Sequence, residues 1–139
     1  QIYDALKLPA RATGGSAGYD FFMPIQIELK PGETVKIPTG IRVTMQPEWV
    51  LKCYPRSGLG FKYRLQLNNT VGIIDSDYFY SDNEGHIFSK ITNDSNENKT
   101  LTIPADTGFM QGIFVEYGIT VDDDATEIRN GGFGSTTAK

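Results

Sequence analysis

Residues 25–55 read IQIELKPGETVKIPTGIRVTMQPEWVLKCYP, and this stretch indicates the fold class. Apolar side chains at Ile25, Ile27 and Leu29 alternate with polar ones, which is the period of a strand with one buried face. Pro31-Gly32 follows as a turn signal. The alternation returns in residues 35–37, 41–45 and 50–54, and proline or glycine separates these runs. We therefore expect a series of short strands joined by tight turns.

The rest of the chain continues this pattern. Further apolar runs occupy residues 71–74, 87–91, 101–103 and 113–121. Only residues 57–63 look helical, and their two glycines limit the helix to one or two turns. The expected fold is all-β: a jelly-roll-like β-barrel of short strands with one short helix and a flexible C-terminal arm.

The length of 139 residues fits a single domain. We expect residues 1–128 to form the β-barrel and residues 129–139 to form a mobile arm, because this tail is rich in Gly, Ser and Thr. Polar residues 92–100 and 81–85 are expected to be exposed loops.

Composition and charge exclude several classes of protein. The chain has 13 basic and 17 acidic residues with no basic stripe, which argues against direct nucleic-acid binding. Its apolar runs are too short to cross a membrane, and no secretion signal is present, so a cytoplasmic location is expected. Cys53 is the only cysteine and His86 the only histidine, so an intrachain disulfide is impossible and a reducing compartment fits best.

Common nucleotide-binding and hydrolase motifs are absent. No glycine-rich segment ends in Gly-Lys-Ser/Thr, and no dinucleotide fingerprint is complete. A Ser-His-Asp or Cys-His hydrolase would depend wholly on His86, which lies beside a polar loop. These observations disfavour P-loop, Rossmann and triad chemistry.

Five short segments, each containing glycine, carry more information when taken together. They are 16–20 (SAGYD), 55–58 (PRSG), 69–78 (NTVGIIDSDY), 111–114 (QGIF) and 129–136 (RNGGFGST). In this order they resemble the five motifs of the trimeric deoxyuridine triphosphatase (dUTPase) family of the bacterial or phage type. A single one of these segments could occur by chance, although the third is fairly specific to the family. All five in this order make the resemblance strong.

The resemblance implies a reaction and an assembly. A member of this family hydrolyses dUTP to dUMP and pyrophosphate with Mg²⁺ on the triphosphate, which limits uracil in DNA and supplies dUMP for thymidylate synthesis. It implies a homotrimer in which three chains share each active site, with dUTP as the partner molecule. For a viral protein the location would be the host cytoplasm.

The resemblance also assigns the two acidic residues. Asp75 follows an apolar run, a place where a carboxylate can be held rigidly, and it matches the catalytic aspartate that deprotonates the attacking water. Asp20 matches the first-motif aspartate, which contacts the metal through water, as suits Mg²⁺. Without the resemblance, both would read as ordinary turn or strand-end residues.

Four residues of the third motif would bind the nucleoside. By resemblance the ring of Tyr78 packs on the deoxyribose and excludes a 2′-hydroxyl. The amide of Asn69 can both donate and accept, as recognition of the uracil edge requires. The backbone at Gly72 and Ile74 would supply further hydrogen bonds. Taken alone, Tyr78 could equally be a sheet-face aromatic and Asn69 a turn residue.

Phosphate contacts are expected from the second and fourth motifs. Arg56 would supply a positive charge and Ser57 would supply a hydroxyl. The backbone near Gly58 would supply N–H donors at the start of a short helix. Gln111 resembles the glutamine that donates to the phosphate chain.

The arm would close over the substrate as a lid. By resemblance Arg129 pairs with phosphate, Phe133 stacks on uracil, and Ser135 and Thr136, beside Gly134, donate to phosphates. Composition alone would predict a disordered terminus.

Three departures from the family pattern are visible. The fifth motif ends with Thr137 where the family favours glycine. The fourth motif begins with Gly108 where the family has arginine. Residues 79–86 are longer than the expected compact turn. We therefore expect residues 79–98 to form a surface insertion and loop outside the catalytic core, where a regulatory protein partner could bind. Two other functions stay open: a nucleotide-sensing regulatory binding module, and a dCTP deaminase of the same fold.

Overall fold

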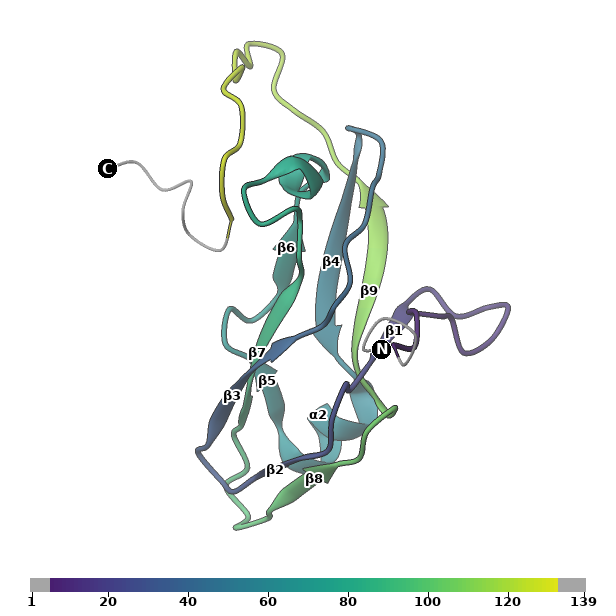
Figure 1. The fold of residues 1–139 in the computed structure, drawn as a ribbon, viewed down its shortest axis with the longest axis vertical. Helices are drawn as coiled ribbons and strands as arrows, with labels where there is room; N and C mark the ends of the chain where they lie inside the picture. The colour runs from purple at the N-terminus through teal and green to yellow at the C-terminus, as the bar shows by residue number, and fades with distance from the viewer. Residues whose placement is uncertain (1–5, 133–139) are drawn as a thin grey trace.

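The computed structural model describes residues 6–132, and this part of the chain is built from antiparallel strands with one short α-helix (Figure 1). The elements are β1 (Tyr19–Phe22), β2 (Ile27–Leu29), β3 (Thr34–Pro38), β4 (Trp49–Pro55), α2 (Ser57–Tyr63), β5 (Leu65–Leu67), β6 (Gly72–Ile74), the 3₁₀-helix η1 (Ser76–Tyr80), β7 (Phe88–Asn93), β8 (Leu101–Ile103) and β9 (Gly108–Glu116).

The strands form three antiparallel sheets. The largest has the order β1-β9-β4-β6, a second joins β3, β7 and β5 in the order β3-β7-β5, and β2 pairs with β8. In the large sheet β4 lies between β9 and β6, so that Cys53 faces Gly112 on one side and Gly72 on the other. Strand β4 therefore lies between β6, which carries part of the third motif, and β9, which carries the fourth motif.

A single apolar core lies inside these sheets. It includes Phe21 of β1, Leu51 and Cys53 of β4, Ile91 of β7 and Phe109 of β9, all nearly inaccessible. Burial of this apolar surface is what stabilises strands as short as three residues.

The predicted all-β, jelly-roll-like class with one short helix is confirmed, and the hydrogen-bonded ladders form three sheets rather than one closed barrel. The strand expected at 41–45 is wrong. Its alternating side chains Ile41, Val43 and Met45 do pack against the core, but no strand of the described residues pairs with this segment. Strand β9 also ends at Glu116, short of the predicted end at 121.

The surface insertion expected at 79–98 needs correction. Residues 88–93 form β7, the central strand of the three-stranded sheet, in which Ile91 and Asn93 are fully buried. Ser81 is also buried, and its hydroxyl accepts a hydrogen bond from the Gly85 amide at 3.2 Å. Only the short stretches on either side of β7 remain at the surface, and a partner contact there stays a prediction.

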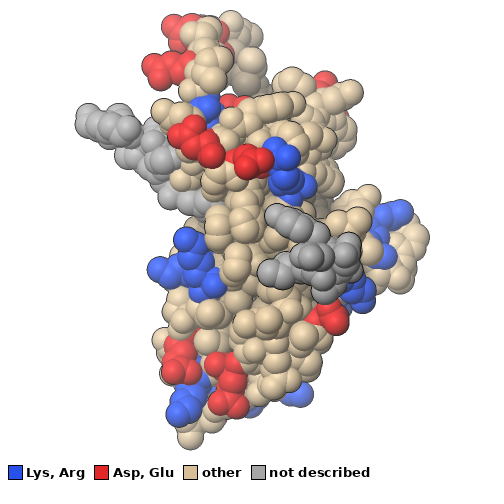
Figure 2. All heavy atoms as spheres, viewed as in Figure 1, with Lys and Arg blue, Asp and Glu red and all other residues tan. Residues whose placement is uncertain are grey.

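Charges on the visible face are mixed. Figure 2 shows acidic and basic side chains in small separate groups, one of the basic groups lying over β3 and β7. Lys36 and Lys90 face each other directly across these strands. Within residues 6–132, no helix has the length and apolar character that a membrane crossing requires.

Candidate active site

Asp75 is held at the end of β6. This strand pairs with β4 through Ile74 opposite Leu51, and Asp75 then has extended backbone (φ −74°, ψ 156°) before η1 begins. The side chain of Asp75 is 51% exposed. A rigid strand therefore presents a solvent-accessible carboxylate, as predicted from the apolar run before it.

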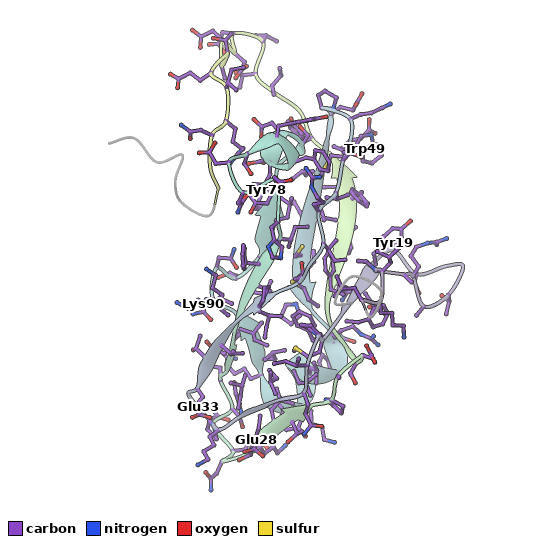
Figure 3. All side chains as sticks on the ribbon, in the orientation of Figure 1. Tyr19, Glu28, Glu33, Trp49, Tyr78 and Lys90 are labelled. Carbon is purple, nitrogen blue, oxygen red and sulfur yellow. The ribbon has the colours of Figure 1, made fainter. Side chains whose placement is uncertain are left out.

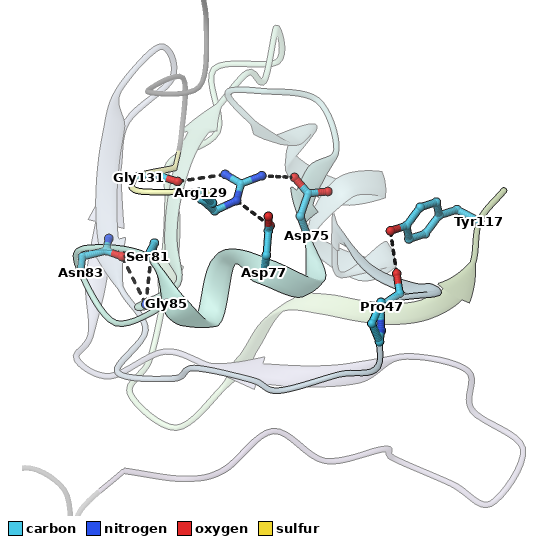
Figure 4. A network of polar contacts seen from close by, with 9 residues as sticks. All are labelled: Pro47, Asp75, Asp77, Ser81, Asn83, Gly85, Tyr117, Arg129 and Gly131. Carbon is cyan, nitrogen blue, oxygen red and sulfur yellow. Dashed lines mark hydrogen bonds and ion pairs between the residues drawn. The ribbon is translucent and has the colours of Figure 1, made fainter. Parts of the chain in front are cut away.

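The C-terminal segment of the same chain contacts this carboxylate. Arg129 donates from Nη2 to Asp75 Oδ2 and from Nε to Asp77 Oδ1, both at 2.6 Å, and from Nη1 to the carbonyl of Gly131 at 2.9 Å (Figure 4). The arginine side chain is only 14% exposed. One guanidinium thus bridges two carboxylates. Residues 130–132 lie beside η1, where the Asp82 amide donates to the Asn130 carbonyl and Gly132 packs on Tyr78.

Asp77 shares the Arg129 guanidinium with Asp75 and was not predicted as a site residue. The segment Asp75-Ser76-Asp77 places two carboxylates two residues apart at the start of η1, where both face Arg129. The Asp-x-Asp pattern that Asp77 forms with Asp75 is the sequence feature from which its place in the site could have been predicted.

Tyr78 lies beneath the C-terminal segment rather than on an open surface. It is 3% exposed, its hydroxyl donates to the carbonyl of His86, and Asn83 Nδ2 donates to the same hydroxyl at 2.9 Å. Burial raises the pKa of Tyr78, against the opposing effects of the Asn83 hydrogen bond and the Arg129 charge. The backbone of Gly132 packs so closely on the Tyr78 ring that no side chain would fit there.

A cavity of about 740 Å³ lies between β6 and β7. It brings together three of the predicted nucleoside-binding residues, Asn69, Gly72 and Ile74. Asp75 and Tyr78 do not line it, although Asp75 directly follows Ile74 in the chain. The full lining comprises Lys36, Cys53, Leu67, Asn68, Asn69, Gly72, Ile74, Ile87, Phe88, Ser89, Lys90 and Met110.

Local geometry explains why the cavity has this shape. A Cβ on Gly72 would lie 3.1 Å from Cys53 Cβ, so glycine lets β6 approach β4 closely. In the turn before β6, Thr70 has φ 69°, a strained value for a β-branched residue, and Val71 donates to the Asn69 carbonyl at 2.7 Å. Burial raises the pKa of the Cys53 thiol to about 12, so the cavity contains a neutral thiol.

The remaining predicted residues form a second group around the C-terminal end of β4. Arg56 Nη1 donates to Asp20 Oδ2 at 2.9 Å, and Asp20 lies opposite Gln111 in the pairing of β1 with β9. Ser57 and Gly58 are exposed in the first turn of α2. A Cβ on Gly18 would lie 2.6 Å from Gln111 Oε1, so this glycine makes room for the Gln111 side chain.

Within one chain, the end of β6 that carries Asp75 is separate from this second group. Ile74 pairs with Leu51 on one side of β4, whereas Gln111 pairs with Tyr54, three residues further along, on the other side. Ideal strand geometry puts the two backbone positions about 14 Å apart. Tyr78 follows Asp75 by three residues, and Tyr19 precedes Asp20. Figure 3 shows these two tyrosines on different parts of the molecule.

Comparison with known proteins identifies the family. A family model described as dUTPase matches residues 4–137. The chain is 40% identical over 136 residues to the deoxyuridine 5'-triphosphate nucleotidohydrolase of Lactococcus lactis, with 96% of this chain and 89% of that protein covered. This chain belongs to the dUTPase family. The resemblance carried by the five motifs is therefore confirmed.

Solved structures of dUTPases have the same fold. The dUTPase from Streptococcus mutans matches with a TM-score of 0.71 at 37% identity, covering 81% of this chain and 88% of that one. The dUTPase of Staphylococcus bacteriophage 80alpha with dUpNHpp matches with a TM-score of 0.71 at 22% identity, covering 96% and 94%. This second match shows the shared dUTPase fold alone.

The departure at Gly108 has a structural counterpart in this dUTPase. A Cβ at position 108 would lie 2.6 Å from Arg56 Nη1 and 3.5 Å from Asp20 Cβ. The guanidinium of Arg56 therefore fills the space where a side chain at position 108 would begin.

The carboxylate of Asp20 fits the water-mediated Mg²⁺ contact expected of a dUTPase. It is a largely buried oxygen donor already held by Arg56, and Mg²⁺ prefers oxygen ligands while keeping several waters. Within residues 6–132, no cluster of three or more His, Cys, Asp or Glu side chains could hold a metal ion. The predicted arm residues Phe133, Gly134, Ser135 and Thr136 lie outside the described residues.

Proposed function

We propose that this dUTPase-family chain hydrolyses dUTP to dUMP and pyrophosphate by attack of water on the α-phosphorus. The observation that carries the proposal is the position of Asp75, a half-exposed carboxylate at the end of the strand whose preceding residues, Gly72 and Ile74, line the cavity. A base held in the cavity would leave its phosphate chain at Asp75. A carboxylate held there can act as general base.

The cavity has the chemistry that a pyrimidine requires. Its lining is largely apolar, and its polar side chains are those of Lys36, Asn68, Asn69, Ser89 and Lys90. The amide of Asn69 and the backbone of Gly72 and Ile74 would fix the orientation of the base. Tyr78 would pack against the deoxyribose and leave no room for a 2′-hydroxyl. Because Gly132 and Arg129 cover Tyr78 and Asp75 in this structure, the C-terminal segment would move when the nucleotide binds.

Arg129 would exchange one anionic partner for another. It pairs with Asp75 and Asp77 here, and a bound triphosphate offers a stronger anion for the same guanidinium. That exchange would release the Asp75 carboxylate to accept a proton from water. Residues 129–139 would then act as the lid, with Phe133 over the base and Gly134, Ser135 and Thr136 near the phosphates.

A neighbouring chain would supply the other half of each site. Asp20, Arg56, Ser57, Gly58 and Gln111 are too far from Asp75 in one chain to act on the same α-phosphorus, which supports a homotrimer with shared sites. Mg²⁺ bound to the triphosphate would neutralise phosphate charge, and Asp20 would contact it through water.

Exposed apolar side chains after β9 support such an assembly. Tyr117, Ile119 and Val121 alternate along the chain in the manner of a strand, yet all three are exposed and unpaired with any described strand. Exposed apolar residues with strand periodicity favour contact with another chain.

Pyrophosphate release tests the proposal. With Mg²⁺ present, we expect release from dUTP and little from dTTP, UTP or dCTP. Asp75→Asn is expected to lower kcat by about 10²- to 10⁴-fold, because the general base is lost. Asp94→Asn is the matched control, since Asp94 is also an exposed carboxylate paired with an arginine, Arg64.

Two outcomes would contradict the proposal. Equal rates on all four nucleotides would remove the specificity argument, and ammonia release from dCTP would favour the deaminase. A chain that binds dUTP and a protein partner without turnover would instead favour the regulatory module.

A further inference from the structure

Ser89 is a buried hydroxyl without a partner. It lies on β7, is 4% exposed, and faces the interior together with Ile91. Among the side-chain nitrogen and oxygen atoms buried in residues 6–132, its Oγ is the one that lacks a hydrogen bond. Buried polar atoms in native proteins are almost always paired, so an unpaired one calls for an explanation.

Nearby buried polar side chains are fully engaged. Thr39 Oγ1 donates to the carbonyl of Ile87 at 2.6 Å. Asn93 Nδ2 donates to the carbonyls of Leu29 at 2.8 Å and Lys99 at 2.9 Å. The lack of a hydrogen-bond partner is therefore specific to Ser89 and is not shared by these other buried polar side chains.

Ser89 lines the same cavity as Asn69, Gly72 and Ile74. The rest of the buried lining near it is apolar: Leu67, Ile87 and Met110. In an apolar cavity the few polar groups fix the orientation of a ligand, and a hydroxyl can both donate and accept. The Cys53 thiol, also in the lining, is only a weak donor.

We propose that the Ser89 hydroxyl hydrogen-bonds the pyrimidine base of the substrate, as a further substrate-contacting residue beside Asn69. This inference rests on the proposed function, because it assigns the base to the cavity. A uracil edge carries carbonyl oxygens and an N–H group, so it offers the partner that Ser89 lacks. None of the five motifs includes Ser89.

Ser89→Ala tests this role. We expect the dissociation constant of dUpNHpp, measured by calorimetry, to rise about three- to tenfold, as expected for loss of one hydrogen bond. KM for dUTP should rise by the same factor, while kcat changes less than about twofold, because the base does not take part in bond breaking. Thr39→Val is the matched control, since it removes a buried hydroxyl that does not line the cavity.

Several results would overturn the inference. An unchanged dissociation constant for Ser89→Ala would mean that Ser89 binds a trapped water only. An equal loss in Thr39→Val would indicate general loosening of the fold. A crystal structure with dUpNHpp in which Ser89 Oγ contacts no ligand atom would exclude the contact without any variant. Absence of wild-type turnover of dUTP would instead overturn the proposed function itself.

Discussion

Glycine at position 108 determines where Arg56 can lie. Because a Cβ there would come within 2.6 Å of Arg56 Nη1, we expect Gly108→Ala to displace the guanidinium from Asp20. The clash involves the end of a flexible side chain, so the free energy of unfolding should change by less than about 1 kcal/mol. With Arg56 misplaced for phosphate binding, kcat/KM on dUTP should fall about tenfold.

A glycine in open space provides the control for this substitution. A Cβ on Gly14 would contact nothing within 4 Å, so Gly14→Ala should leave both stability and kcat/KM unchanged. Thermal unfolding and steady-state kinetics measure the two effects separately. If Gly108→Ala left kcat/KM on dUTP unchanged, the absence of a side chain at position 108 would have no role in positioning Arg56.

The Cys53 thiol should make stability fall at alkaline pH. Burial raises its pKa from 9.0 to about 12, so above pH 9 the unfolded chain loses the thiol proton while the folded protein keeps it. The unfolded state then binds fewer protons, and the free energy of unfolding decreases as pH rises from 9 toward 12. The slope from this group should approach about 1.4 kcal/mol per pH unit.

Cys53→Ala isolates that contribution. Other titrating groups are common to both proteins, so the difference in unfolding free energy between them should be constant below pH 9 and change above it. Urea unfolding at several pH values measures this difference. Parallel curves up to pH 12 would show that the thiol is not shielded as its burial implies.

At the scale of elements, Arg129 joins the C-terminal segment to η1. We expect Arg129→Ala to release residues 129–132, so that the amide of Asp82, which donates to the Asn130 carbonyl at 2.8 Å, exchanges hydrogen faster. The free energy of unfolding should change by less than about 1 kcal/mol, because Asp75 and Asp77 are half exposed and solvent weakens their ion pairs. Hydrogen exchange followed by mass spectrometry measures the release.

Arg11→Ala is the matched control for that experiment. Arg11 is an exposed arginine bound to the carbonyls of Gly14 and Ser16, away from η1, so its loss should leave exchange at Asp82 unchanged. Added salt should mimic Arg129→Ala in the wild-type protein, because screening weakens exposed ion pairs. Slow exchange at Asp82 in Arg129→Ala would mean that other contacts hold the segment.

Hydrophobic periodicity predicted most of the strands, including the three-residue strands β2, β6 and β8, but it missed β1 and β5. It also predicted one strand that the structure does not have. Residues 41–45 carry the strand pattern but pair with no strand among residues 6–132. The four-residue strand β1 has no clear alternation, and Asp20 within it is buried because it pairs with Arg56. Such long-range contacts are not encoded in any local pattern.

For the whole molecule, the sequence predicted the family and the residue types of the site better than their arrangement. Motif order placed Asn69 and Gly72 together, and the structure brings both to one cavity. It could not reveal Ser89 or explain Gly108, because the role of each depends on neighbours from distant strands. Nor could it show that Arg129 contacts Asp75 of the same chain.

Mixing two inactive variants tests whether sites are shared between chains. Asp75→Asn removes the proposed general base, and Gln111→Ala removes the proposed phosphate contact at the other end of β4 from Asp75. If each site takes these residues from different chains of a trimer, each mixed trimer has one intact site of three. Random mixing in equal amounts then restores about one quarter of wild-type activity. Each variant refolded alone is the control, and a mixture no more active than the mean of the two would place the complete site within one chain.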